Sequence, residues 1–203
     1  MTELPFDISL TRVADGVAVT GRIVRLTREM AQTRIDGRWW TGIGVNRHIR
    51  NAENDHSWTW RTEVGALTNN RWSECVAVTT DDNEIQGAMI LRLDARSFVD
   101  ESAGAVNVYA VSTAPRNRGW LVAQPVFQGV GTALIRYAIL KSYELGLSGR
   151  VVLFAIDEPR TVEFYLRMGF GQVADPDGRF ADYMMELTPQ TAEAILREAG
   201  YEL

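Results

Sequence analysis

The chain has 203 residues, of which 46% are hydrophobic and 23% are charged, and its formal net charge at pH 7 is −5. This composition excludes an intrinsically disordered chain, and the length predicts a single domain spanning residues 1–203. The acidic balance argues against a nucleic-acid surface over the whole molecule and mildly favours a cationic or amine-bearing partner.

Cysteine and histidine are rare in the sequence. Cys75 is the sole cysteine, so no internal disulfide can form, and neither His48 nor His56 has the spacing of a metal ligand. The N-terminus lacks the basic and apolar blocks of a signal peptide, and no apolar run reaches the length of a membrane span. These features predict a cytoplasmic protein with no membrane partner and no metal.

The N-terminal third predicts strands followed by short helices. Two alternating segments, Phe6–Val13 and Gly16–Leu26, fit either a hairpin or one strand with a lead-in. The stretch from Thr27 to Asn70 has the weakest pattern, and two short helices fit it, one with Ser57 as N-cap before Trp58 to Leu67. This stretch contains four tryptophans, Trp39, Trp40, Trp58 and Trp60. They either pack on a sheet or form an aromatic pocket that binds a cation or an apolar chain.

The remainder predicts a mixed sheet with helices on its faces, an α/β (α+β) fold. Alternation or β-branched residues indicate strands at Glu74–Thr80, Ile85–Leu93, Ala105–Thr113 and Asp182–Leu187. The unbroken apolar run Val151–Ile156 is typical of a strand buried on both faces. Helices are expected over 130–146, from the N-cap Asp157 to about Met168 before Gly169, and from about Pro189 to Ala199 after the N-cap Thr188. The strands at 105–113 and 151–156 flank one helix, so they predict a βαβ unit with a parallel pair.

A glycine-rich turn stands at the start of the predicted 130–146 helix. Its sequence is Gln128-Gly129-Val130-Gly131-Thr132-Ala133. Unpaired N–H groups and a partial positive charge at a helix start, together with glycines that let the backbone curl, make a nest for a phosphate. The turn is no P-loop, because the lysine is missing, and Leu134 takes the place of the third glycine of G-x-G-x-x-G. A strand-to-helix turn that needs glycine for geometry alone stays open.

A second motif, Glu163 to Phe170 with the sequence EFYLRMGF, lies on the next predicted helix. Glycine turn, buried strand and F-Y-x-x-x-G-F helix in this order resemble the GNAT superfamily of N-acetyltransferases, clearly over about 105–187. The resemblance implies a GNAT-like mixed central sheet with a splayed parallel strand pair. It implies transfer of an acetyl group from acetyl-CoA, as co-substrate, to a primary amine of a small molecule or of a peptide or protein, directly in a ternary complex.

The resemblance also implies the site residues. The backbone amides of Gln128, Gly129, Val130, Gly131, Thr132 and Ala133 match the loop that holds the pyrophosphate of the coenzyme. The pantetheine arm would pair with the exposed strand backbone at Val111, Ser112 and Thr113. Tyr165 matches the family tyrosine that protonates the departing thiolate, and a packed aromatic residue is the alternative role for it.

The sequence departs from the family pattern at three places. Residues 114–127 intervene before the loop, an insertion of about ten residues. They form either a surface loop or a flap over the acceptor or the coenzyme, where Arg116 and Arg118 could meet the 3′-phosphate. No carboxylate lies on the strand at 105–113, so the identity of the general base stays open. The alternatives are a water chain, an amine that binds already neutral, and four side chains, namely Glu74, Asp94, His56 and Asp157. Glu158 stands where relatives often have an asparagine that contacts pantetheine.

These departures keep two other functions open. One is a non-catalytic acyl-CoA-binding regulatory module, which the missing strand carboxylate motivates. The other is a toxin-like acetyltransferase acting on aminoacyl-tRNA, which the arginines of the first quarter permit and the acidic balance argues against. The sequence leaves the oligomeric state open, with a homodimer among the options.

Overall fold

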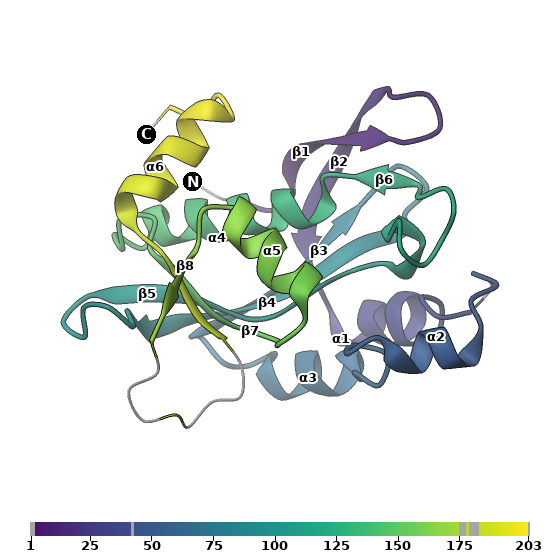
Figure 1. Ribbon diagram of the computed structural model, residues 1–203, viewed down its shortest axis with the longest axis horizontal. Coiled ribbons are helices and arrows are strands. Elements are labelled where there is room, and N and C mark those ends of the chain that lie inside the picture. The colour runs from purple at the N-terminus through teal and green to yellow at the C-terminus, as the bar shows by residue number, and fades with distance from the viewer. Residues whose placement is uncertain (1–2, 42, 175–177, 179–182, 203) are drawn as a thin grey trace. The chain divides into compact units, whose positions relative to one another are not determined.

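The computed structural model describes residues 3–41, 43–174, 178 and 183–202, which form two compact units (Figure 1). The N-terminal unit comprises residues 3–90 and 110–134, and the C-terminal unit comprises the described residues within 91–109 and 135–202. Two strands and one helix contribute to both units: β4 (Ile85–Arg96), β5 (Gly104–Thr113) and α4 (Val130–Glu144).

The described strands form one mixed sheet, which confirms the expected fold class. The order of neighbouring strands is β6-β1-β2-β3-β4-β5-β7-β9-β8. Besides β4 and β5, the strands are β1 (Phe6–Arg12), β2 (Ala18–Arg25), β3 (Ser73–Thr79), β6 (Phe127–Gln128), β7 (Val151–Ala155), β8 (Gly171–Val173) and β9 (Tyr183–Leu187). Asp182, which the sequence assigns to the last strand, lies outside the described residues.

The first two strands form a hairpin, which decides between the two arrangements that the sequence allows. β1 and β2 are antiparallel, with a register that runs from the pair Phe6 and Ile23 to the pair Thr11 and Ala18. On its other side β1 pairs with the short strand β6, where Thr11 faces Gln128. Pairing with the hairpin therefore fixes the position of Gln128, the residue that precedes Gly129 in the glycine turn.

The expected parallel pair is present in the C-terminal unit. β5 and β7 pair in parallel from Val106 and Val151 to Val108 and Leu153. β9 pairs with β7 along its whole length, from Val151 to Ala155. Among the described residues the parallel register ends at Val108, although β5 continues to Thr113. The two strands thus share a short ladder, as expected for a splayed pair.

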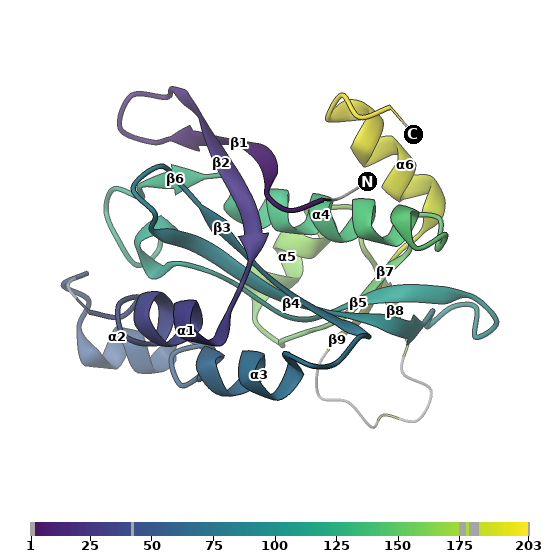
Figure 2. The same ribbon diagram turned by 180° about the vertical axis from the view of Figure 1, so that it is seen from behind.

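Helices and a buried cluster cover one face of β3 and β4 in the N-terminal unit (Figure 2). The helical segments are α1 (Arg28–Met30), η1 (Ala31–Asp36), α2 (Arg47–Ala52) and α3 (Trp60–Leu67). Trp39 and Trp60 are 2% and 3% exposed, and they belong to the same cluster as Ala77 of β3 and Ala88 of β4. For these two tryptophans the packing interpretation is correct.

The start of α3 differs from the sequence expectation. The helix begins at Trp60 and Ser57 does not cap it. Instead the Asp36 carboxylate accepts hydrogen bonds from the N–H groups of Trp60, at 2.9 Å, and Arg61, at 3.0 Å. A carboxylate from a distant segment thus satisfies the unpaired donors of the first turn and complements the helix dipole.

The helices α5 (Pro159–Arg167) and α6 (Pro189–Glu198) belong to the C-terminal unit. Thr188 caps α6 as expected, but Glu158 rather than Asp157 caps α5, accepting from the Thr161 N–H at 2.9 Å. Burial alone would raise the pKa of Glu158, but hydrogen bonds from Arg160 and Thr161 outweigh it and lower that pKa. Within the described ranges, no helix is long and apolar enough to cross a membrane.

A buried carboxylate ties a loop to the sheet in the C-terminal unit. Glu186 of β9 is 2% exposed and pairs with Arg150 at 2.7 Å. It also accepts hydrogen bonds from the Ser97 hydroxyl and from the Phe98 N–H, both at 2.7 Å. Because a buried charge is tolerated only when it is paired and hydrogen-bonded, this cluster holds the loop after β4 against β9.

Replacing Glu186 with alanine is expected to lower the free energy of unfolding by about 3–5 kcal/mol, because it leaves the Arg150 guanidinium, whose side chain is only 17% exposed, without this partner. Urea denaturation measures the change. The matched control is Arg167→Ala, which breaks an ion pair with Glu163 whose side chains are 68% and 69% exposed. That change is expected to cost less than about 1 kcal/mol. Equal losses in the two variants would contradict a stabilising role for Glu186.

Candidate coenzyme site

The glycine turn lies between β6 and α4, in the N-terminal unit. Gly129 has φ of +90°, a backbone conformation that residues other than glycine rarely adopt. Its carbonyl accepts the first bond of the helix, from the Ala133 N–H at 2.9 Å. The N–H groups of Val130, Gly131 and Thr132 precede that bond, so helix geometry gives them no intrahelical partner. Three donors therefore gather at the positive end of a fifteen-residue helix.

Gly87 of β4 lets the start of α4 lie directly on the sheet. A Cβ atom at this position would lie 2.6 Å from Val130 Cγ1, 3.1 Å from Leu134 Cδ1 and 3.3 Å from the Ser112 carbonyl oxygen. All four residues belong to the N-terminal unit. Gly87 thus sets the spacing between the turn and the end of β5.

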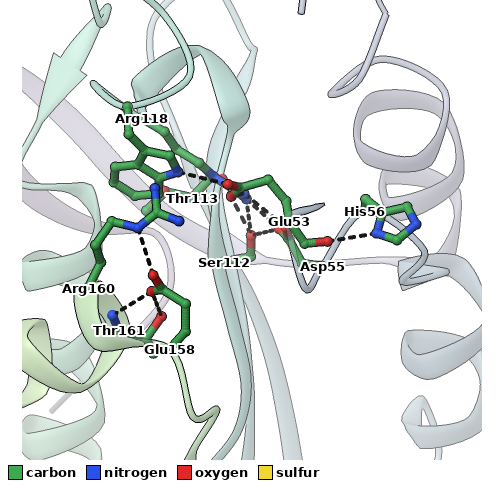
Figure 3. Close-up of polar contacts among 10 residues, drawn as sticks. Glu53, Asp55, His56, Ser112, Thr113, Arg118, Glu158, Arg160 and Thr161 are labelled. Atoms are coloured by element: carbon green, nitrogen blue, oxygen red, sulfur yellow. Dashed lines mark hydrogen bonds and ion pairs between the residues drawn. The ribbon is translucent and has the colours of Figure 1, made fainter. Parts of the chain in front are cut away.

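The end of β5 is bound by the side chain of Arg118 (Figure 3). The Thr113 carbonyl accepts from Arg118 Nε at 3.0 Å and from Nη2 at 2.7 Å. The Ser112 hydroxyl accepts from Nη2 at 2.7 Å and donates to the Asp55 carboxylate. Any contact of Thr113 with a coenzyme would therefore have to use its N–H or its side chain. Val111, the residue before Ser112, is half-buried and takes no part in these hydrogen bonds in the described structure.

The insertion at 114–127 is anchored rather than free. It begins with the 3-10 turn η2 (Pro115–Asn117), and Arg118 follows with only 4% of its surface exposed. Arg116 donates to the Ile85 carbonyl at 2.9 Å and to Gln86 Oε1 at 3.2 Å. Burial lowers the pKa of Arg116, and the nearby Glu84 carboxylate opposes this. Both arginines thus bind groups of the chain itself, which argues against the 3′-phosphate role.

Tyr165 lies on α5, in the C-terminal unit, and is 6% exposed. Its ring contacts those of Phe164 and Phe170 edge-on, with centroids 5.2 and 5.5 Å apart. Burial raises the pKa of its hydroxyl well above the usual value. The phenol therefore keeps its proton over the whole physiological range. A proton donor requires this, but a tyrosine that only packs in the core would also remain protonated.

Comparison with known proteins adds to this geometry. No family model and no curated protein matches the sequence. A similar solved structure is the GNAT domain of S. lividans PAT, with a TM-score of 0.60 and 16% identity over 90% of this chain and 95% of that chain. A structure described as a bacterial toxin has a TM-score of 0.57 and 17% identity over 98% of this chain and 100% of its own. A chimera of spermidine N-acetyltransferase SpeG from Vibrio cholerae and hSSAT has a TM-score of 0.52 and 13% identity over 85% and 98%.

The chain has the GNAT fold. At identities of 13–17% these likenesses describe the fold alone, so the reaction and the acceptor have to be argued from the chemistry of the chain's own residues. The two sequence motifs fall on the turn before α4 and on α5, and the strand β7 lies between them in the chain.

The four side chains considered as general bases are divided between the two units. Asp94 and Asp157 are exposed, and Glu74 is half-buried in β3. His56 Nδ1 lies 2.7 Å from the Glu53 carbonyl oxygen. Because a carbonyl can only accept, this contact assigns the proton to Nδ1 and uses His56 as a turn-stabilising residue.

Sequence reasoning missed the residues that shape this part of the GNAT sheet. Gly87 stands alone in an apolar strand, and such a glycine signals close approach of another backbone or helix, so a signal existed. Arg118 and its partners Glu53 and Asp55 carry no local signal, because their positions differ by more than sixty residues. Trp40 shows a related case, since the guanidinium carbons of Arg50 and Arg118 lie 5.6 and 5.4 Å from its ring centroid. The Trp40 ring, which the sequence offered as part of an aromatic ligand pocket, therefore makes cation–π contacts with two arginines of the chain itself.

Proposed function

We propose that the protein is an acetyl-CoA-dependent N-acetyltransferase that acts on a primary amine of a small molecule or of a peptide or protein. The observation that carries this proposal is the glycine turn at the start of α4, where Gly129 has φ of +90° and three N–H groups precede the first helical bond. A turn of this kind on a GNAT fold suits the pyrophosphate of a coenzyme.

The proposed reaction is direct transfer between two bound substrates. The amine nitrogen attacks the carbonyl carbon of the thioester, and the oxyanion is stabilised by a backbone N–H near Val111. The C–S bond then breaks, the thiolate takes a proton from the Tyr165 hydroxyl, and the proton that the amine loses restores the neutral phenol through solvent. Burial raises the pKa of Tyr165, which keeps the phenol protonated but makes it a weaker acid than the departing thiol, so its proton transfer has to be coupled to the return of the proton that the amine loses.

Two measurements on the wild-type protein test the proposal. Titration calorimetry with acetyl-CoA tests the coenzyme site, and a screen of amines with detection of the free thiol tests turnover. Micromolar binding together with thiol release that depends on the amine would support the enzyme. Binding without turnover on any amine would favour a non-catalytic acyl-CoA-binding module, and the lack of binding would overturn the coenzyme assignment.

Gly87→Ala is expected to weaken acetyl-CoA binding about tenfold, because the added methyl group would push Val130 and the start of α4 away from β4. Calorimetry measures the affinity and thermal denaturation the stability. Gly104→Ala is the matched control, since its Cβ would lie 2.8 Å from Leu147 Cδ2 in the C-terminal unit. Both variants are expected to lose stability by about 1–3 kcal/mol, but only Gly87→Ala should lose affinity. Equal affinities would contradict the spacing role of Gly87.

A second candidate is a toxin-like acetyltransferase that acts on aminoacyl-tRNA, and a structure described as a bacterial toxin shares the fold over 98% of the chain. Three arginines of the first quarter contact groups of the chain itself, which weakens the case for contact with RNA. Arg38 pairs with Glu84 at 2.6 Å, Arg34 donates to the Asn83 carbonyl at 3.1 Å, and Arg22 lies 3.5 Å from Asp7. RNA binding that falls steeply as salt rises would favour this candidate over a small-molecule acceptor.

A further inference from the structure

Arg118 joins segments that lie far apart in the sequence. Its Nη1 donates to Glu53 Oε2 at 2.8 Å and to Asp55 Oδ1 at 2.9 Å, and its Nη2 binds the second oxygen of Asp55. The same guanidinium binds the Ser112 hydroxyl and the Thr113 carbonyl at the end of β5. All of these residues belong to the N-terminal unit. One buried side chain therefore connects the loop after α2, the end of β5 and the insertion.

The guanidinium closes the end of β5 to further pairing. A carbonyl oxygen has two lone pairs, and Arg118 Nε and Nη2 take both at Thr113, at 3.0 and 2.7 Å. The next backbone donor is also used, because the Ala114 N–H donates to the Gln86 carbonyl at 2.8 Å. A ligand that pairs with this strand as an added strand therefore has to end before the Thr113 carbonyl.

The insertion carries this constraint to the glycine turn. The Arg118 N–H donates to the Pro115 carbonyl at 3.1 Å, and the neighbouring Asn117 accepts from the Phe127 N–H at 3.0 Å through its side-chain oxygen. Phe127 is followed by Gln128 and by the turn itself. The contact of Arg118 with the end of β5 is thus coupled, through these hydrogen bonds, to the segment that precedes the glycine turn.

The loop that contains Glu53 and Asp55 depends on the same residue. The two carboxylate-bearing side chains are 10% and 11% exposed, and Arg118 forms an ion pair with each of them. The Trp120 indole N–H, also from the insertion, donates to Glu53 Oε1 at 3.0 Å. A buried bidentate guanidinium holds such carboxylates in one geometry, which a lysine cannot reproduce.

We propose that Arg118 is a positioning residue of the acyl-coenzyme A site. It occupies the Thr113 carbonyl, so that the pantetheine arm pairs with the backbone of Val111 and Ser112 and goes no further along β5. It also holds the Glu53–Asp55 loop at that point. This inference rests on the proposed function, and it assigns to the insertion a role in placing the arm rather than in covering the coenzyme.

The test compares two ligands that share a pyrophosphate. Acetyl-CoA contains the pantetheine arm, whereas 3′-phosphoadenosine 5′-diphosphate lacks it. Arg118→Met is expected to raise the Kd of acetyl-CoA about tenfold, because the end of β5 and the Glu53–Asp55 loop lose the side chain that fixes them, and to change that of the nucleotide less than about twofold. Calorimetry measures the first Kd, and competition against acetyl-CoA measures the second.

Two further variants make the outcome decisive. Arg116→Met is the matched control, since it removes the other guanidinium of the insertion, which does not contact Ser112 or Thr113 in the described structure, and it should leave the ratio of the two Kd values unchanged. Arg118→Lys keeps the charge in the cluster if Arg118→Met does not fold, and it should still raise the ratio. An unchanged ratio in the folded Arg118 variants overturns the inference. Absence of binding of both ligands to the wild type would instead overturn the proposed function.

Discussion

Replacing Gly131 with glutamate is expected to weaken acetyl-CoA binding at least about 100-fold, because a carboxylate at the second residue of α4 repels a pyrophosphate within a few ångströms of it. The new side chain would also occupy the space above the N–H groups of Val130, Gly131 and Thr132, which precede the first helical bond. Titration calorimetry with acetyl-CoA measures the loss, and circular dichroism checks that the variant is folded.

Two control variants separate charge from bulk. Gly131→Gln adds a neutral side chain of nearly the same shape, and it should weaken binding much less than glutamate does. Leu145→Glu adds the same charge just after the last residue of α4, at a site that is 42% exposed, and it should leave binding unchanged. Wild-type affinity in Gly131→Glu would mean that the glycines serve only the geometry of the turn and that no phosphate binds there.

The parts of the fold that could be predicted depend on short-range patterns. Thr188 caps α6 through the Thr191 N–H, three residues away, and Gly169 ends the preceding helix region with φ of +86°. Both follow from local residue types. The turn at Gly129 belongs to the same class, since its φ of +90° is a local requirement that glycine meets. The sequence therefore predicts these features without knowledge of the rest of the chain.

The missed features depend on residues brought together by folding. Asp36 caps a helix that begins 24 residues later, a partner that no local pattern around Thr59 or Ser57 indicates. Arg118 looks like an ordinary loop arginine in the sequence, yet the carboxylates that bury it lie 65 and 63 residues away. Such pairings are fixed by tertiary structure, which overrides local preference. The sequence thus predicts the glycine turn, whose binding of a phosphate stays a prediction, but it does not predict the Arg118 network.

The β4 strand shows an intermediate case. Its alternation predicts one buried face, whereas Ile85 to Leu91 are buried at every position. The helical cluster of the N-terminal unit packs on Ala88 and Ile90, and the start of α4 lies over Gly87. A strand that is covered on both sides loses the link between alternation and exposure. The close approach of α4 explains why a glycine stands at the third position of this strand.

Tyr165→Phe is expected to lower kcat about 100- to 1,000-fold while the Kd of acetyl-CoA stays within about twofold of the wild type, because only the proton donor is removed. Because burial raises the pKa of Tyr165, its phenol remains protonated where an ordinary tyrosine, with a pKa near 10, begins to ionise. We therefore expect no alkaline loss of kcat from this residue below about pH 10. Steady-state kinetics on an amine found by the screen, from pH 6 to about pH 10, provide the measurement.

The raised pKa of Tyr165 also makes the free energy of unfolding depend on pH. Above about pH 10 the unfolded chain releases the Tyr165 proton while the folded chain retains it, so this residue contributes stability below that pH and loses the contribution as the pH rises. Tyr143→Phe is the matched control, since burial also raises the pKa of Tyr143, on α4, and its loss should leave kcat unchanged. If Tyr165→Phe retained full turnover, Tyr165 would be only a ring packed between Phe164 and Phe170, and another group would have to protonate the thiolate.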